Sequence, residues 1–81
     1  MQCKVKLFAV AKQLVGADAC TVNVAEPATI AMLKAALAEQ VPALAGLVTG
    51  VRFAVNADFA RDDTPLDVQS EIALIPPVSG G

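Results

Sequence analysis

Only one stretch of this chain combines the length of a helix with an apolar stripe at helical spacing. Four apolar residues recur at intervals of three, four and four: Ile30, Leu33, Leu37 and Val41. This spacing places them on one face of a helix. Thr29 can cap the start of that helix through its hydroxyl, and Pro42 ends it. Because one amphipathic helix covers one face of one sheet, the rest of the chain must supply that sheet.

Alternating apolar and polar residues predict the strands. In the first strand, Cys3, Val5 and Leu7 face one side, while Lys4 and Lys6 face the other. A period of two with β-branched residues indicates a half-buried strand. Similar signals place the predicted strands at residues 2–10, 19–25, 51–55, 59–61 and 72–75.

Short helical and irregular pieces connect these strands. Residues 11–15 predict one helical turn, which Gly16 can end in a left-handed conformation. Residues 43–48 predict a second short helical piece. Residues 56–58 predict a turn, and residues 62–65 a polar loop.

The order strand, strand, helix, strand, short strand, strand predicts an α+β fold with its helices on one side. Such an order within 81 residues favours the β-grasp, or ubiquitin-like, fold. We expect a mixed sheet of about five strands with one main helix packed on one face. We also predict a single domain over residues 1–81, in which residues 76–81 form an extended C-terminal tail.

The composition excludes several kinds of function. The chain has no histidine, which excludes Ser-His-Asp and Cys-His catalysis and zinc sites with histidine ligands. Its net charge is −2, and its six Lys and Arg residues are scattered along the sequence, so we expect no nucleic-acid partner. Apolar runs fall short of the ~20 residues of a membrane helix, and the N-terminus lacks a signal-peptide pattern. We therefore predict a cytoplasmic protein without a membrane partner.

The two cysteines, Cys3 and Cys20, are predicted to be free thiols. Each begins a strand pattern, so in an antiparallel hairpin they should lie near opposite ends. Four strand steps correspond to about 13 Å, which is beyond the limit of about 7 Å between the Cα atoms of a disulfide.

The face of the sheet opposite the helix is more apolar than a solvent-facing surface normally is. One interpretation is that Phe8 or Phe59 tucks under a loop and that Ile75 is an isolated exposed residue. The other is a partner interface, because contiguous exposed apolar residues mark interaction surfaces. The full set favours the interface: Phe8, Ala54, Phe59, Ala73 and Ile75.

The last residues form a slender segment: Pro76, Pro77, Val78, Ser79, Gly80 and Gly81. Five residues beyond Pro76 reach roughly 17 Å when extended. Two glycines have no Cβ and so can pass through a narrow channel. The carboxylate of Gly81 is therefore the chemical group that the chain presents farthest from its own body.

Several stretches carry a family resemblance: Val5-Lys6-Leu7-Phe8-Ala9, Leu14-Val15-Gly16, Val55-Asn56, Thr64-Pro65-Leu66 and Ile75-Pro76-Pro77-Val78-Ser79-Gly80-Gly81. The ending is the most specific of them. Over its whole length the chain resembles the small subunits of molybdopterin synthase, a ubiquitin-like sulfur-carrier family. One departure is Gln69-Ser70-Glu71, where family members often carry Gly-Asp-Glu. It concerns the conformation of that loop, because serine tolerates a left-handed turn less well than glycine.

The resemblance implies a chemistry for the C-terminus. An ATP-dependent, ubiquitin-activating-type adenylyltransferase would adenylate the Gly81 carboxylate. A sulfur donor enzyme would then displace the adenylate and leave a thiocarboxylate on Gly81. The thiocarboxylate would donate sulfur to the cyclic pyranopterin precursor, precursor Z, and two rounds would build the dithiolene of molybdopterin.

The resemblance also implies site residues. Gly81 is the reacting terminus, and Pro77, Val78, Ser79 and Gly80 would lie in a channel of the large synthase subunit. The large subunit would contact three apolar residues, Phe8, Phe59 and Ile75, in a heterotetramer. The chain itself would bind no cofactor or metal, since ATP is used by its activating partner.

Four alternatives remain open. One is a ubiquitin-like modifier that joins Gly81 to lysines of target proteins. Another is the thiamine-pathway sulfur carrier, which also ends in Gly-Gly but is usually shorter and lacks the paired prolines. A third is a binding module with an inert tail. The last is a metal site, which lacks the spacing of an EF-hand and would draw on clustered carboxylates: Asp58, Asp62, Asp63, Asp67 and Glu71.

Overall fold

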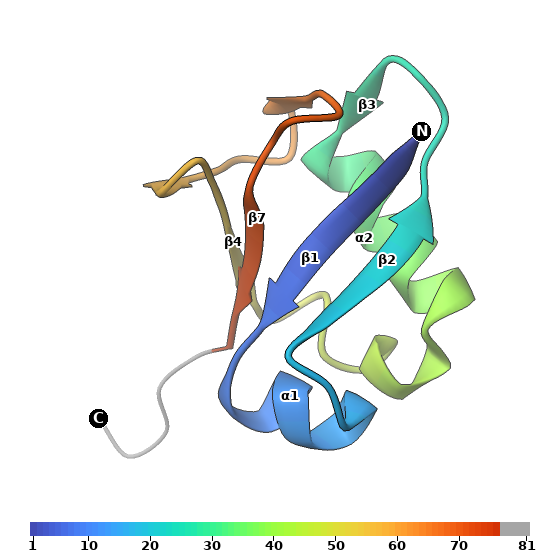
Figure 1. The fold of residues 1–81 in the computed structure, drawn as a ribbon, viewed down its shortest axis with the longest axis vertical. Helices are drawn as coiled ribbons and strands as arrows, with labels where there is room; N and C mark the ends of the chain where they lie inside the picture. The colour runs from blue at the N-terminus through green and yellow to red at the C-terminus, as the bar shows by residue number, and fades with distance from the viewer. Residues whose placement is uncertain (77–81) are drawn as a thin grey trace.

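The main sheet has five strands in the computed structural model, which describes residues 1–76 (Figure 1). Strands β1 and β7 run parallel and the other neighbours antiparallel, so the sheet is mixed. This confirms the predicted α+β, β-grasp arrangement. In spatial order the strands are β2 (Ala19–Asn23), β1 (Gln2–Leu7), β7 (Ile72–Ile75), β4 (Arg52–Val55) and β5 (Asp58–Phe59).

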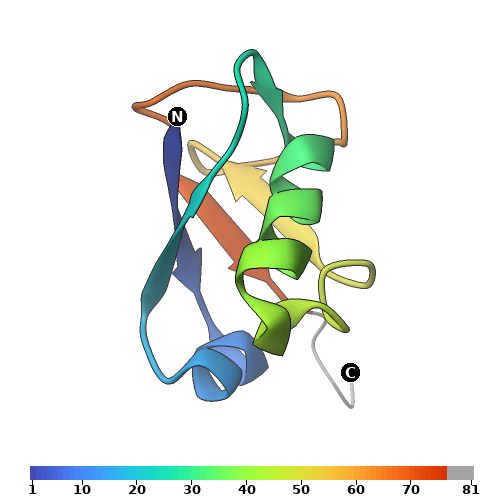
Figure 2. The same ribbon diagram turned by 90° about the vertical axis from the view of Figure 1, so that its right-hand side faces the viewer.

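Helix α2 (Ile30–Gln40) packs across one face of this sheet (Figure 2). Three residues of its predicted stripe, Ile30, Leu33 and Leu37, are buried, whereas the fourth, Val41, lies just past the end of the helix and is half-buried. The Thr29 Oγ1 accepts a hydrogen bond from the backbone N–H of Met32 at 3.4 Å, which is the predicted cap. None of the helices within residues 1–76 has the length and hydrophobicity that a membrane span requires.

The core lies between α2 and the inner face of the sheet. Strands β1, β2, β4 and β7 turn alternate residues toward it, as the alternating pattern predicted, whereas both residues of the short β5 are exposed. In β1 the buried positions are Cys3, Val5 and Leu7. They face the apolar residues of the other strands and of α2: Val22, Val24, Ile30, Leu33, Leu37, Phe53, Ile72 and Leu74.

The first strand is shorter than predicted. Strand β1 ends at Leu7, and α1 (Ala9–Val15) follows, with the extended Phe8 as its N-cap residue. Alternation continues into Ala9 in the sequence, but Ala9 adopts a φ of 51°, which turns the chain out of the strand. The predicted end of this helix is confirmed, because Gly16 has a φ of 80° and its N–H bonds to the carbonyl of Lys12.

Several short elements differ from the predicted ones. The strand predicted at residues 59–61 is β5, which spans Asp58–Phe59 and so begins within the predicted turn at residues 56–58. The polar loop at residues 62–65 leads into a two-residue strand, β6 (Pro65–Leu66), which pairs with β3 (Ala28–Thr29). Two-residue strands have no periodicity to read, so the sequence could not predict them. The second helical piece is a single 3₁₀ turn, η1 (Pro42–Leu44), followed by further turns up to residue 50.

The loop with the serine departure is closed by polar side chains. The backbone N–H of Asp67 donates to Ser70 Oγ at 3.0 Å, and the Asp67 carboxylate accepts from the backbone N–H of Gln69 at 2.8 Å. Neither Gln69 nor Ser70 is among the residues with positive φ. A glycine is therefore not needed at either position.

The cysteines are free, as predicted, but the reason given for it was wrong. Val5 pairs with Cys20, and Cys3 pairs with Val22. The two thiols therefore lie on diagonal positions of the β1–β2 pair, and not at opposite ends of it. Diagonal neighbours are about 7–8 Å apart, which is at the limit for a disulfide, and both thiols are unpaired.

The turn of the β4–β5 hairpin holds an alanine in a strained backbone conformation that a substitution can relieve. Val55 pairs with Asp58, so Asn56 and Ala57 form a two-residue turn, with φ values of 52° and 72°. Turns of this kind need positive φ at both positions, which asparagine tolerates and glycine adopts freely. Alanine pays a steric penalty of about 1–2 kcal/mol in this region.

We therefore expect Ala57→Gly to raise stability by about 1 kcal/mol, equivalent to about 4–8 °C in Tm for a domain of this size. The matched reverse change is Gly16→Ala, at a φ of 80° with no atom within 4 Å of the added Cβ. It should lower stability by a similar amount through strain alone. Thermal melting of both variants tests this, and a lower Tm for Ala57→Gly would contradict it.

Candidate functional site

The face of the sheet away from α2 carries three rows of side chains, set by the strand register. The central row runs from Lys6 through Ala73 and Ala54 to Phe59. In a second row, Ile75 pairs with Arg52. Phe8 belongs to the same row, because Leu7 pairs with Leu74 in parallel strands and the next residues, Phe8 and Ile75, are therefore level with each other. Lys4 begins the third row. We call this surface the open sheet face: Lys4, Lys6, Phe8, Arg52, Ala54, Phe59, Ala73 and Ile75.

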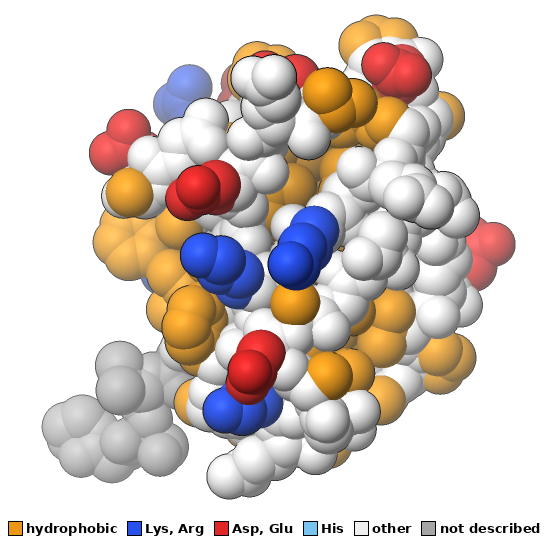
Figure 3. Space-filling model, viewed as in Figure 1, with side chains coloured by type: hydrophobic (Ala, Val, Ile, Leu, Met, Phe, Trp, Pro, Cys, Tyr) orange, Lys and Arg blue, Asp and Glu red, His pale blue; other side chains and the backbone are white. Residues whose placement is uncertain are grey.

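The open sheet face exposes the large apolar residues that the sequence singled out. Phe8 is 49% exposed and Phe59 is 61% exposed, so neither tucks under a loop. Ile75 and Ala73 are half-buried. Ala54 is on this face, as predicted, but is only 8% exposed, because its methyl group lies low among longer neighbouring side chains. In Figure 3 hydrophobic side chains gather at one edge of this face, and basic side chains lie over its centre.

The low alanines leave a shallow groove in the open sheet face. Its volume is about 200 Å³, and Ala54 and Ala73 line its floor, with Lys6, Phe8 and Glu71 around it. Such an apolar depression between exposed aromatic residues can receive a side chain of a partner protein. The groove is too open to be an enzyme active site that excludes water.

Strand β7 ends next to Phe8, at one end of this face. Ile75 is the last residue of β7, and Pro76 follows it. Because β7 is parallel to β1, the chain leaves the sheet beside Phe8. Phe8 and Ile75 thus lie together at the point of exit, while Phe59 lies across the groove on β5. The predicted tail residues Pro77, Val78, Ser79, Gly80 and Gly81 lie outside the described residues.

The cysteine thiols are poor candidates for the chemically reactive group of this protein. Burial raises the pKa of Cys3 and also that of Cys20. Both are therefore protonated at neutral pH, whereas thiol chemistry needs the thiolate. Both side chains also face the core side of the sheet, and not the open sheet face.

The acidic residues are dispersed rather than gathered into a ligand set. Asp62 forms an ion pair with Lys34 at 2.6 Å, and Asp63 forms a longer one with Arg61 at 3.7 Å. Within residues 1–76 no group of three or more Cys, Asp or Glu side chains could hold a metal ion.

Near the open sheet face, Lys12 forms an exposed ion pair with Asp18 at 2.8 Å. The hydrogen bond between them, aided by their charges, raises the pKa of Lys12 and lowers that of Asp18. Both groups therefore stay charged across the physiological range. Lys12 is thus neutralised within the chain.

One contact on the open sheet face was missed by the sequence analysis. The guanidinium of Arg52 stacks over the ring of Phe59, with the Arg52 Cζ 4.2 Å from the ring centroid. Arg52 and Ala54 are two residues apart in β4, so their side chains lie on the same face of the sheet. The stacking itself depends on the β4–β5 register, which the sequence does not specify.

Comparisons with known proteins identify the family. The model of the ThiS family matches residues 5–81, which is almost the whole chain. The chain belongs to the ThiS family. Two curated relatives of this ThiS-family chain each carry the name molybdopterin synthase sulfur carrier subunit. The relative from Chlamydomonas reinhardtii is 34% identical, and the alignment covers 100% of both chains. The relative from Arabidopsis thaliana is 31% identical over 100% of this chain and 84% of its own length.

Solved structures share the fold of this ThiS-family chain. A crystal structure of SAMP1 from Haloferax volcanii, a small archaeal modifier protein, matches with a TM-score of 0.85 and 28% identity over 100% of both chains. The complex of subunits 1 and 2 of the molybdopterin-converting factor from Helicobacter pylori includes a chain that matches with a TM-score of 0.69. That chain is 23% identical over 100% of both chains and supports the fold alone. The family resemblance read from the sequence is thereby confirmed.

Proposed function

We propose that this chain is the sulfur carrier subunit of a molybdopterin synthase. The observation that carries the proposal is its identity of 31% and 34%, over its full length, to two proteins with that name. The geometry agrees with this role, because the chain leaves the sheet beside an exposed apolar face. The chain has no histidine, so acids and bases for the reaction would come from partner proteins.

The proposed reaction begins at the Gly81 carboxylate, whose charge makes it a poor electrophile. An activating adenylyltransferase would join it to the AMP moiety of ATP and release pyrophosphate. A sulfur donor enzyme would then supply sulfur at the oxidation level of sulfide to the acyl carbon, AMP would leave, and a thiocarboxylate would form. The thiocarboxylate sulfur would displace an oxygen substituent of the cyclic pyranopterin precursor and form a C–S bond to it. Water would then cleave the acyl C–S bond, which leaves the sulfur on the pterin and restores the Gly81 carboxylate. Two carriers would deliver the two sulfur atoms of the dithiolene.

The partner in this proposal is the large subunit of the synthase. A chain with this fold occurs in the Helicobacter pylori complex of the two subunits of the molybdopterin-converting factor. By analogy, the large subunit would cover Phe8, Ile75 and Phe59 and take the tail into a channel. A tail residue with no Cβ, such as Gly80, fits a narrow channel. The chain itself would bind no metal and no cofactor.

We expect Phe8→Asp to weaken binding to the large subunit at least about 30-fold, since loss of an aromatic anchor costs about 2 kcal/mol or more. Phe8 is 49% exposed, so the isolated fold should keep its Tm. Val68→Asp is the matched control, because Val68 is 71% exposed and lies in the loop before β7. Titration calorimetry measures both affinities. Equal affinities of the two variants would show that the open sheet face is not the interface.

Reconstitution tests the proposed function as a whole. Carrier that has been thiocarboxylated at Gly81 would be mixed with the large subunit and the cyclic pyranopterin precursor, and molybdopterin would be measured. Product should form in proportion to thiocarboxylate consumed. Consumption of precursor with untreated carrier, or no product with treated carrier, would contradict the proposal.

A second candidate is a ubiquitin-like protein modifier. The observation that favours it is the 28% identity and the TM-score of 0.85 with SAMP1 from Haloferax volcanii. In that case the activated Gly81 would form an isopeptide bond with a lysine of a target protein. Mass spectrometry of lysates for peptides with a diglycine remnant on lysine separates the two candidates, because sulfur transfer leaves no such adduct.

A further inference from the structure

The six basic side chains of this molecule divide into two groups with different surroundings. Lys12, Lys34 and Arg61 each form an ion pair with an aspartate of the same chain. In the part of the chain that the structure describes, the other three cations form no ion pair. All three of these lie on the open sheet face: Lys4, Lys6 and Arg52. This division could not be predicted from the sequence, in which the cations are scattered.

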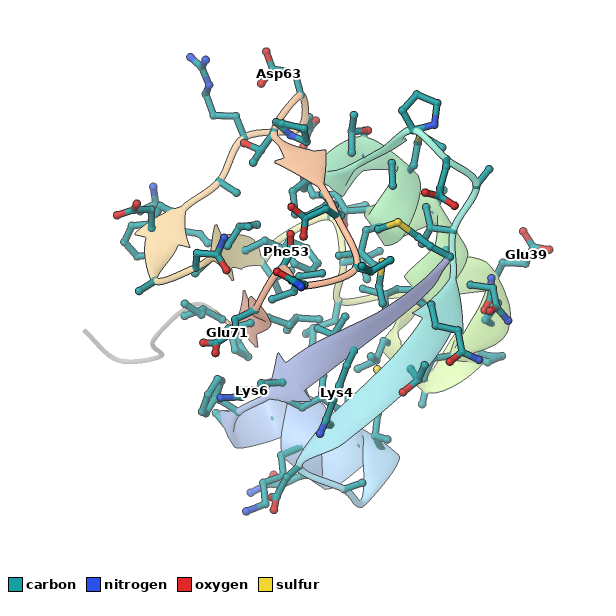
Figure 4. The ribbon with its side chains drawn as sticks, turned by 45° about the horizontal axis from the view of Figure 1, so that its top comes forward. Lys4, Lys6, Glu39, Phe53, Asp63 and Glu71 are labelled. Atoms are coloured by element: carbon teal, nitrogen blue, oxygen red, sulfur yellow. The ribbon has the colours of Figure 1, made fainter. Side chains whose placement is uncertain are left out.

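The unpaired cations surround the apolar part of the face. Lys4 and Lys6 stand two residues apart on β1 and project to the same side, as Figure 4 shows. Arg52 lies beyond the alanine groove, with its guanidinium stacked on Phe59 at 4.2 Å. Stacking on one face of the guanidinium leaves the N–H groups at its edge free for a carboxylate. Glu71, the residue before β7, lies near Lys4 and Lys6 at the rim of the groove but forms no ion pair with either within the described residues.

This arrangement is unusual for a chain whose net charge is −2. Side chains on Lys4 and Lys6 start about 7 Å apart, and like charges at that distance repel each other. Elsewhere in the described residues the cations are neutralised by neighbouring aspartates. Apolar side chains lie between the three unpaired cations, which suits a folded protein surface and not an extended polyanion.

We propose that the large subunit presents carboxylates to Lys4, Lys6 and Arg52 when it covers the open sheet face. This inference rests on the proposed function and names the chemistry of the partner surface. Phe8 and Ile75 supply the apolar centre of the interface, and the three cations supply an electrostatic rim. Such a rim accelerates association and fixes the orientation of the docked partner more than it adds affinity.

The test is the rate of association of the full chain with its large subunit, measured by stopped flow. Lys6→Glu and Arg52→Glu should each slow association about tenfold at low ionic strength. The effect should fade as the Debye length falls from about 30 Å to about 3 Å with added salt. Arg61→Glu is the matched control, because it makes the same change in net charge at a cation that is already paired with an aspartate of its own chain, Asp63.

A conservative variant tests the stacked geometry separately. Arg52→Lys keeps the charge but loses the planar fork, so it should keep the fast association and dissociate faster than wild type. Equal rates for Lys6→Glu, Arg52→Glu and Arg61→Glu, or association of wild type that is independent of salt, would overturn this inference while leaving the proposed function intact. Failure of wild type to bind the large subunit at all would overturn both.

Discussion

Replacing Gly81 by leucine should abolish sulfur transfer and leave the thermal stability of the chain unchanged. The residue lies beyond β7 and five positions past Pro76, the last described residue. The hydrophobic core described above is made of residues up to Leu74, and a glycine has no side chain to contribute to a core. In the proposed function its carboxylate is the reacting group, and a branched side chain next to it would block entry into a narrow channel. Molybdopterin formation and thermal melting, measured on the same preparation, test this prediction.

Gly46→Leu is the control for this experiment. Gly46 lies in the turns after η1, no φ in the left-handed region is recorded for it, and no atom lies within 4 Å of a Cβ added there. The same substitution at this site should leave sulfur transfer unchanged. Normal product formation by Gly81→Leu would contradict the assignment of Gly81 as the working group.

Replacing Phe53 by alanine should have the largest effect on stability, a loss of about 3–5 kcal/mol. The Phe53 side chain is 1% exposed and lies in the core row with Leu74 and Leu7. A domain of 81 residues typically has about 4–12 kcal/mol in total, so the variant should be close to unfolding. Denaturant titration gives the free energy of unfolding directly.

Phe59→Ala is the comparison for Phe53→Ala. Phe59 is 61% exposed, and its stacking with Arg52 contributes about 0.5–1 kcal/mol. We expect it to change the free energy of unfolding by no more than that. Similar losses in the two variants would mean that the core does not lie between α2 and the sheet.

The buried side of the fold was predicted well from the sequence, because residues that face the core recur at regular intervals along a strand or a helix. Val5, Leu7, Phe53 and Leu74 follow a period of two and are all buried. The stripe of α2 and its Thr29 cap follow rules that act within a few residues. Local chemistry therefore predicted both the elements and the faces that they bury.

Features that depend on register or on single dihedral angles could not be predicted. The positive φ of Ala9 ends β1 early, although nothing in the alternating pattern indicates it. The diagonal position of Cys20 relative to Cys3 follows from the β1–β2 pairing, which the sequence left open. The gathering of Lys6 and Arg52 on one face depends on the order of three strands, β1, β7 and β4.

The site was predicted in part. Strand parity placed Phe8 on the face opposite the helix, and the interface interpretation expected Phe8 and Phe59 to be exposed there, which they are. Burial of Ala54 at 8% was not predicted, because it results from the longer side chains around it. The roles of the tail residues stay predictions, since they depend on partner proteins.

The central claim, that Gly81 carries sulfur, is tested most directly by intact mass spectrometry of the chain. The chain would be incubated with a cognate activating enzyme, ATP and a sulfur donor, alongside a variant that lacks Gly81. The account predicts a mass increase equal to the replacement of one oxygen by one sulfur, seen in the full chain and absent from the variant. An unchanged mass in the presence of a competent activating enzyme would contradict it and would favour the modifier or a binding module with an inert tail.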